Sequence, residues 1–143
     1  MIAHDMIHDP FPQAQAAVAA RARETLDAVN AQDADRLDAL HLWGTKFSKF
    51  DDGEPAGRQD AEATRRIERE LVATATAISF RAADVKVDVV GPVAVATFVL
   101  DWSATMPGDE TYAARSRATL VMVDDRGDWK IVHEHFSVFP GAA

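Results

Sequence analysis

The carboxyl group with the most scope for chemistry is Glu134, near the end of the 143-residue chain. Side chains alternate between the two faces of a strand, so Glu134 is expected to share a face with Val132 and Phe136. A lone carboxyl among apolar side chains should have a raised pKa, which is how general acids and bases are tuned. The alternative is a structural carboxylate paired with Arg115, Arg117 or a histidine. We predict Glu134 as the first candidate catalytic residue.

A second candidate is Asp101, which stands in the apolar run VATFVLDWSA. An aspartate buried in such a strand would need a partner. Alternation places Asp101 on the same face as Val99, which would bring it to a pocket on that side. The alternative is a position near the strand end, where the carboxylate is already solvated.

His133 and His135 stand two residues apart, so a strand would point both to one face, about 6.6 Å apart along the chain. They could share a metal ion if a third ligand came from elsewhere. The chain has no HExxH pattern or other complete ligand set, so we expect no metal and no organic cofactor. Histidines on the outer face of a sheet, hydrogen-bonded across a subunit interface, are the favoured interpretation.

These candidates belong to a hairpin that covers residues 118–137, with the sequence ATLVMVDDRGDWKIVHEHFS. Two runs rich in β-branched residues flank Asp124–Gly127, whose residue types are typical of a turn. Apolar residues occur on both faces, which predicts a hairpin inside a larger sheet rather than at its edge. Alternation assigns one face to the odd positions, which are Trp129, Ile131, His133 and His135.

The preceding chain predicts helices first and long strands after them. Apolar residues at helical spacing indicate helices over 13–30 and 58–73, with a short helix capped by Asp33 between them. A short strand is expected within 45–52 and four long strands within 78–138. A solvated face of the third helix is expected to carry Arg65, Arg66, Glu68, Arg69 and Glu70. The order α-α-β-α-β-β-β-β predicts an α+β fold with the helices packed on one face of a curved antiparallel sheet.

Length and composition limit the remaining possibilities. The chain is the size of one domain, expected over 13–140 after an N-terminal arm over 1–12. It has no cysteine, which excludes disulfides and thiolate chemistry. A net charge of −8 without a basic stripe disfavours nucleic acid. With no signal-peptide pattern and no apolar run near the ~20 residues that span a bilayer, we expect no membrane contact and a cytoplasmic protein.

The order of elements, together with the closing phrase GDWKIVHEHFS, resembles the nuclear transport factor 2-like superfamily over about residues 13–138. This superfamily includes ketosteroid isomerase, the SnoaL-like polyketide cyclases and the association domain of calcium/calmodulin-dependent kinase II. The resemblance implies a cystatin-like fold, in which a cone-shaped sheet wraps around the N-terminal helices. It also implies a pocket open at one end and homodimers that pair through their sheets.

The resemblance does not extend to the catalytic residues of ketosteroid isomerase. That enzyme needs a carboxylate base and two oxyanion donors, a tyrosine and a protonated acid. In this chain the matching positions fall near Ser48, Thr25 and Ser116. None of the three can replace the base, the tyrosine or the protonated acid of that enzyme. A shift of one residue would bring Asp51 or Asp52 closer to the base position. Steroid isomerisation is therefore not expected.

The kinase association domain carries arginines in its pocket, and the resemblance places apolar residues there instead. The matching positions are Leu120, Phe136 and a third near Val99, which implies an apolar ligand. Ser48 or Ser116 would act as a hydrogen-bond donor. The full set of expected ligand-binding residues is Trp43, Ser48, Phe50, Ser116, Leu120, Met122 and Phe136.

Residues and resemblance together predict a domain that binds a small apolar or amphipathic molecule in a cone-shaped pocket. As an enzyme it would be a cofactor-free isomerase, cyclase or dehydratase in which Glu134 and Asp101 transfer protons. The alternative is a non-catalytic, homo-oligomeric association or interaction module. Its interface would be the sheet face that carries Trp129, Ile131 and the two histidines.

Overall fold

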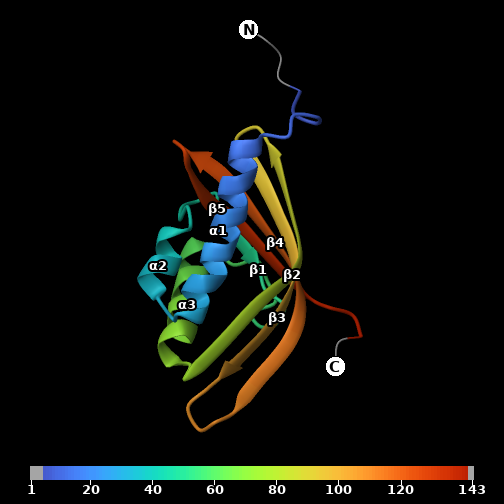
Figure 1. Ribbon diagram of the computed structural model, residues 1–143. Helices are drawn as coiled ribbons and strands as arrows, with labels where there is room; N and C mark the ends of the chain where they lie inside the picture. Colours follow the sequence, from blue (N-terminus) through green and yellow to red (C-terminus); the bar gives the residue numbers. More distant parts are fainter. Residues whose placement is uncertain (1–4, 142–143) are drawn as a thin grey trace.

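The computed structural model describes residues 5–141, and three helices lie together against one face of a curved sheet (Figure 1). In chain order the elements are α1 (Pro12–Asn30), α2 (Ala34–Ala39), β1 (Ser48–Phe50), α3 (Ala61–Thr74), β2 (Ala77–Val90), β3 (Val93–Thr105), β4 (Thr111–Asp125) and β5 (Asp128–Val138). The predicted α+β fold and order of elements are confirmed. No helix in the described part of the chain combines the length and the apolar character needed to cross a bilayer.

The helices begin where local chemistry satisfies their first backbone N–H groups. Pro12 opens α1, at a position where a missing N–H costs nothing. Asp33 caps α2 by accepting a hydrogen bond from the backbone N–H of Arg36, as its residue type predicts. Asp60 caps α3 through the N–H of Ala63, at 2.8 Å, so this helix begins three residues later than expected.

The sheet has the order β1-β5-β4-β3-β2, so the hairpin of β4 and β5 lies inside it, as predicted. The four long strands pair antiparallel, whereas β1 pairs parallel to β5, with Ser48 opposite His133. The sheet is therefore mixed rather than wholly antiparallel. This pairing brings Lys49 beside Glu134 on the last strand.

The core lies between the helices and the inner face of the sheet. Even-numbered residues of β3 and β4, among them Leu100 and Leu120, are buried there. Odd-numbered residues such as Val99 and Asp101 consequently belong to the outer face. The inner face therefore carries Ser116, Leu120 and Met122, three of the residues expected to bind a ligand.

A bulge in β5 overturns the expected face of Trp129 and Ile131. Val121 pairs with His133, but the next residue, Met122, pairs with Ile131, so one residue of β5 is left without an opposite partner. An extra residue in one strand reverses the side-chain alternation beyond it. Trp129 and Ile131 are therefore buried in the core, on the same face as Glu134, and their predicted location beside the two histidines is wrong.

Candidate functional site

A cavity of about 570 Å³ lies between the helices and the inner face of the sheet. Its walls are mainly apolar, and its lysine, aspartate and glutamate residues come from β1, the segment after it, α3 and β5. Cavities of this size and character are typical of small-molecule sites. The lining residues are Thr25, Leu26, Val29, Leu37, Lys49, Asp51, Asp52, Gly53, Glu54, Ile67, Glu68, Leu71, Val72, Phe80, Phe98, Leu100, Trp102, Ala104, Met106, Tyr112, Ala114, Leu120, Glu134, Phe136 and Val138.

Glu134 lies in this wall and is only 3% exposed. One of its oxygens accepts a hydrogen bond from Nε2 of His41, and the other lies 3.4 Å from Nζ of Lys49. Burial by itself would raise the pKa of Glu134, but the charges of Lys49 and His41 outweigh burial and hold it well below its usual range. Glu134 is thus a fixed anion rather than the raised-pKa carboxyl that its apolar neighbours in sequence suggested.

Lys49 supplies the positive charge at the centre of this group. Its ammonium lies 3.3 Å from Glu68, 3.4 Å from Glu134 and 3.7 Å from Asp51. Burial would lower the pKa of Lys49, but the surrounding carboxylates outweigh it and raise the pKa above the usual lysine range. Lys49 therefore stays protonated and is not available as a nucleophilic amine.

His41 closes the group from the side of α2. Its Nδ1 donates to the backbone carbonyl of Leu37 at 2.8 Å, which leaves Nε2 directed at Glu134. Its ring stacks on Trp43 at 4.5 Å between centroids, with the planes 12° apart. Burial lowers the pKa of His41, but Glu134 outweighs it and raises the pKa to about 9. The imidazole is therefore charged at neutral pH and donates from both nitrogens.

Glu68 on α3 has the opposite character to Glu134. Burial and the neighbouring charge of Glu134 raise its pKa to about 7, and Lys49 and His41 only partly oppose this. One oxygen accepts a hydrogen bond from Lys49, at 3.3 Å. The other, Oε2, is buried and has no hydrogen-bond partner within residues 5–141. This second oxygen lies 3.9 Å from Nε2 of His41, an ion pair without a hydrogen bond. Glu68 can therefore lose or gain a proton near neutral pH.

Donor atoms of His41, Glu68 and Glu134 all lie within 4.8 Å of one another, a spacing that could hold a metal ion. The ammonium of Lys49 already lies within 3.4 Å of both carboxylates. A metal cation would have to compete with this ammonium for the same oxygens. The geometry favours a site whose cation is a lysine side chain.

A second polar group in the cavity is formed by Asp52, Ser116 and Trp102. The indole N–H of Trp102 donates to Oγ of Ser116 at 3.2 Å, and the hydroxyl of Ser116 donates to Oδ2 of Asp52. An indole N–H can only donate, so the direction of both hydrogen bonds is fixed. Ser116 is fully buried, whereas Asp52 is half-buried and lines the cavity.

The structure brings three of the predicted catalytic and ligand-binding residues to the cavity, which are Glu134, Leu120 and Phe136. Ser116 reaches it through Asp52. Met122 is fully buried in the core and does not line the cavity. Glu134 forms the structural ion pairs that were the alternative to a catalytic role. Its partners are His41 and Lys49 rather than Arg115 or Arg117.

Asp101, Ser48 and Phe50 lie away from the cavity. Asp101 is on the outer face of β3, where it pairs with Arg115 at 2.7 Å, because the inner face of that strand belongs to the even positions. Ser48 lies 2.9 Å from Nδ1 of His133. Phe50 packs its ring against His133 and His135. These two histidines form no group of three ligands within the described residues.

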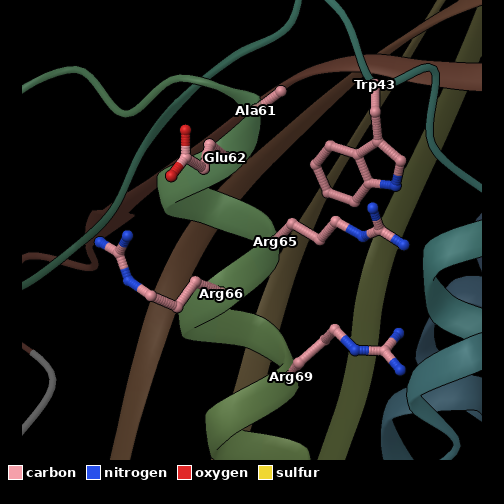
Figure 2. A pocket seen from close by; sticks show the side chains of 6 residues that line it. All are labelled: Trp43, Ala61, Glu62, Arg65, Arg66 and Arg69. Atoms are coloured by element: carbon pink, nitrogen blue, oxygen red, sulfur yellow. The ribbon is translucent and has the colours of Figure 1, made fainter.

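Trp43 borders a separate groove of about 340 Å³ beside α3 (Figure 2). Figure 2 shows Arg65 extended beneath the indole ring, with Arg66 pointing away on the other side of the helix. Arg65 and Arg69 both pair with Asp38, at 2.8 and 2.6 Å. Trp43 therefore does not line the cavity, although its ring stacks on His41.

Sequence reasoning missed His41, Lys49 and Glu68, although the last two left a signal. Lys49 is two residues after the buried Phe47, which directly precedes β1, so extended backbone points both side chains to the same face. Glu68 is four residues from both Thr64 and Val72, which are the buried positions of α3. Its predicted place on a solvated face is therefore wrong.

The comparisons with known proteins agree on the fold. A candidate dehydratase of the NTF2-like family from Streptomyces avermitilis superposes with a TM-score of 0.78 at 20% identity, covering 89% of this chain and 96% of that one. A candidate scytalone dehydratase from Novosphingobium aromaticivorans superposes with a TM-score of 0.76 at 12% identity, covering 89% of this chain and 85% of that one. A candidate calcium/calmodulin-dependent protein kinase II association domain from Xanthomonas campestris superposes with a TM-score of 0.72 at 16% identity, covering 87% of this chain and 86% of that one. The comparison with curated proteins found no match.

At these low identities the structural similarity shows a shared fold, and the chemistry has to be inferred from the residues of the site. The family comparison is more direct, because the model described as a SnoaL-like domain matches residues 18–141, from α1 to beyond the end of β5. This chain therefore belongs to the SnoaL-like domain family.

Proposed function

We propose that the cavity binds a small, largely apolar molecule and that Glu68 acts on it as a general acid and base. The observation that carries this proposal is Oε2 of Glu68, which accepts no hydrogen bond within residues 5–141 although Glu68 lines an apolar cavity. A carboxyl group with a pKa near 7 is matched to proton transfer at neutral pH. Glu134, a predicted catalytic residue, supports the transfer as the fixed charge that tunes Glu68.

The chemistry available to Glu68 is isomerisation or dehydration of a carbonyl compound. In an isomerisation, ionised Glu68 would take a proton from a carbon next to the carbonyl and return it to another carbon. In a dehydration, protonated Glu68 would give its proton to a leaving hydroxyl, which departs as water, while a base in the cavity takes a proton from the neighbouring carbon. The two structural relatives described as candidate dehydratases support this class of reaction.

Proton exchange tests this proposal without knowledge of the natural substrate. In D₂O, the protein should accelerate deuterium incorporation at the α-carbons of a neutral bicyclic ketone such as 2-tetralone, followed by proton NMR. Glu68→Gln should lower the accelerated rate by about 100-fold or more. The matched control is Glu70→Gln, which removes an exposed carboxylate from the same helix and should leave the rate unchanged. Equal rates for the wild type and Glu68→Gln would remove Glu68 from the chemistry.

A second candidate function is self-association through the outer face of the sheet. The supporting observation is an exposed apolar pair on neighbouring strands of this face, Val90 at 49% and Val93 at 38% exposure. His133 and His135 remain available on this face, whereas Trp129 and Ile131 do not because the bulge turns them into the core. We expect a homodimer paired through its sheets. Sedimentation that shows a monomer at micromolar concentration would contradict the homodimer.

A further inference from the structure

Asp52 is a carboxyl group that the proposed proton transfer does not use. Its Oδ2 accepts the hydroxyl proton of Ser116, and no hydrogen bond reaches Oδ1 from residues 5–141. No lysine, arginine or histidine of the described chain forms an ion pair with it. Asp52 therefore has one oriented oxygen and one free oxygen beside an apolar cavity.

The chain holds Asp52 in place through groups that lie deeper in the sheet. Ser116 is fully buried on β4, and its Oγ also accepts from the indole of Trp102 on β3. Since that indole fixes the serine proton toward Asp52, the carboxyl has a defined direction. Two neighbouring strands thus orient a side chain that belongs to the segment after β1.

The charges around the cavity restrict what Asp52 can bind. Lys49 is the single basic residue among the described lining residues, and its ammonium already faces three carboxyl groups. Asp51 and Glu54 line the same side of the wall as Asp52. An anionic ligand would meet these acids without a free cation to pair with, and in a low-dielectric site this repulsion is large.

We propose that Asp52, oriented by Ser116 and Trp102, is a ligand-binding and specificity-determining residue of the cavity. It accepts a hydrogen bond from a hydroxyl or ammonium group of the ligand, so the cavity takes neutral or cationic apolar molecules and rejects carboxylates. This inference rests on the proposed function in one respect, that the cavity binds a small molecule. It is independent of whether Glu68 transfers protons.

Three probes with one ring system test the inference: 2-naphthol, 2-naphthylmethylamine and 2-naphthoate, titrated by calorimetry at pH 7. The wild type should bind the alcohol and the amine at least tenfold more tightly than the carboxylate. Asp52→Asn should reduce the advantage of the amine over the carboxylate at least fivefold. Ser116→Ala, which keeps the acid but removes its orienting donor, should reduce it in the same direction.

The control variant is Asp84→Asn, because Asp84 is an exposed acid in β2 with a positive φ of 53° that asparagine tolerates. It removes the same charge and should leave the order of affinities unchanged. Naphthoate bound as tightly as the amine by the wild type would overturn the inference, while small-molecule binding would stand. An unchanged order in a folded Asp52→Asn variant would overturn it as well. Failure of all three probes to bind would overturn ligand binding in the cavity and, with it, the role of Asp52.

Discussion

His41 and Glu134 are 93 residues apart in the chain, and Nε2 of the histidine donates a hydrogen bond to the glutamate in the core. Both side chains are almost fully buried, and the backbone carbonyl of Leu37 fixes the orientation of the imidazole. This contact joins the end of α2 to β5. Lys49 and this contact together hold the pKa of Glu134 well below its usual range, and the neighbouring Glu68 is left as the carboxyl that titrates near neutral pH.

Replacement of Lys49 tests the charge balance of this group. Lys49→Met would leave Glu134 buried with only His41 to compensate its charge, so we expect a loss of about 3 kcal/mol or more in the free energy of unfolding. Urea denaturation at pH 7 measures this loss. Lys46→Met, at an exposed position in the preceding turn, should change the stability by less than about 0.5 kcal/mol. Equal effects of the two substitutions would contradict the proposed role of Lys49.

Glu68 should make stability fall as the pH rises. Its pKa is about 7 in the folded protein against 4.5 for an ordinary glutamate, so between these pH values the folded state binds more protons than the unfolded chain. The free energy of unfolding of the wild type relative to Glu68→Gln should therefore decrease by about 1–3 kcal/mol from pH 4.5 to 7. Urea titrations of both proteins across this range measure the difference. A constant difference would show that burial does not perturb Glu68.

His41 should lose its proton only at a pH well above that of an ordinary histidine. Its pKa of about 9 against 6.5 for an ordinary imidazole means that its stabilisation is complete below pH 6.5 and is lost as the pH rises through 9. The ring nitrogen signals of His41 in NMR should therefore keep the shifts of an imidazolium at pH 7.5. His41→Gln should remove this part of the pH dependence of stability. His135→Gln, at an exposed position, should retain it.

Filling the mouth of the cavity should block a ligand without unfolding the protein. Ala114 lines the cavity on β4 and is exposed, so Ala114→Phe places a ring in open space rather than in the packed core. Affinity for 2-naphthol should fall at least tenfold, while the melting temperature stays within a few degrees of the wild type. Ala113→Phe, on the opposite face of the same strand, is the matched control and should leave the affinity unchanged.

The sequence alone determined the order of the elements and three residues of the pocket wall. Helical spacing, capping residues and strand alternation are local properties, so they located α1, α2 and the hairpin of β4 and β5. They also identified Leu120, Phe136 and Glu134, because an uninterrupted parity links these residues on the inner face.

Only the tertiary structure decided the partners and the protonation of the site. A single extra residue in β5 reversed the faces of Trp129 and Ile131, and a bulge leaves little trace in residue pattern. The parallel pairing of β1 with β5 brought Lys49 to Glu134, and the packing of α3 brought Glu68 to both. Whether a buried carboxyl is a fixed anion or a titrating group depends on which charges lie within a few ångströms of it. Contacts between residues far apart in the chain set those distances.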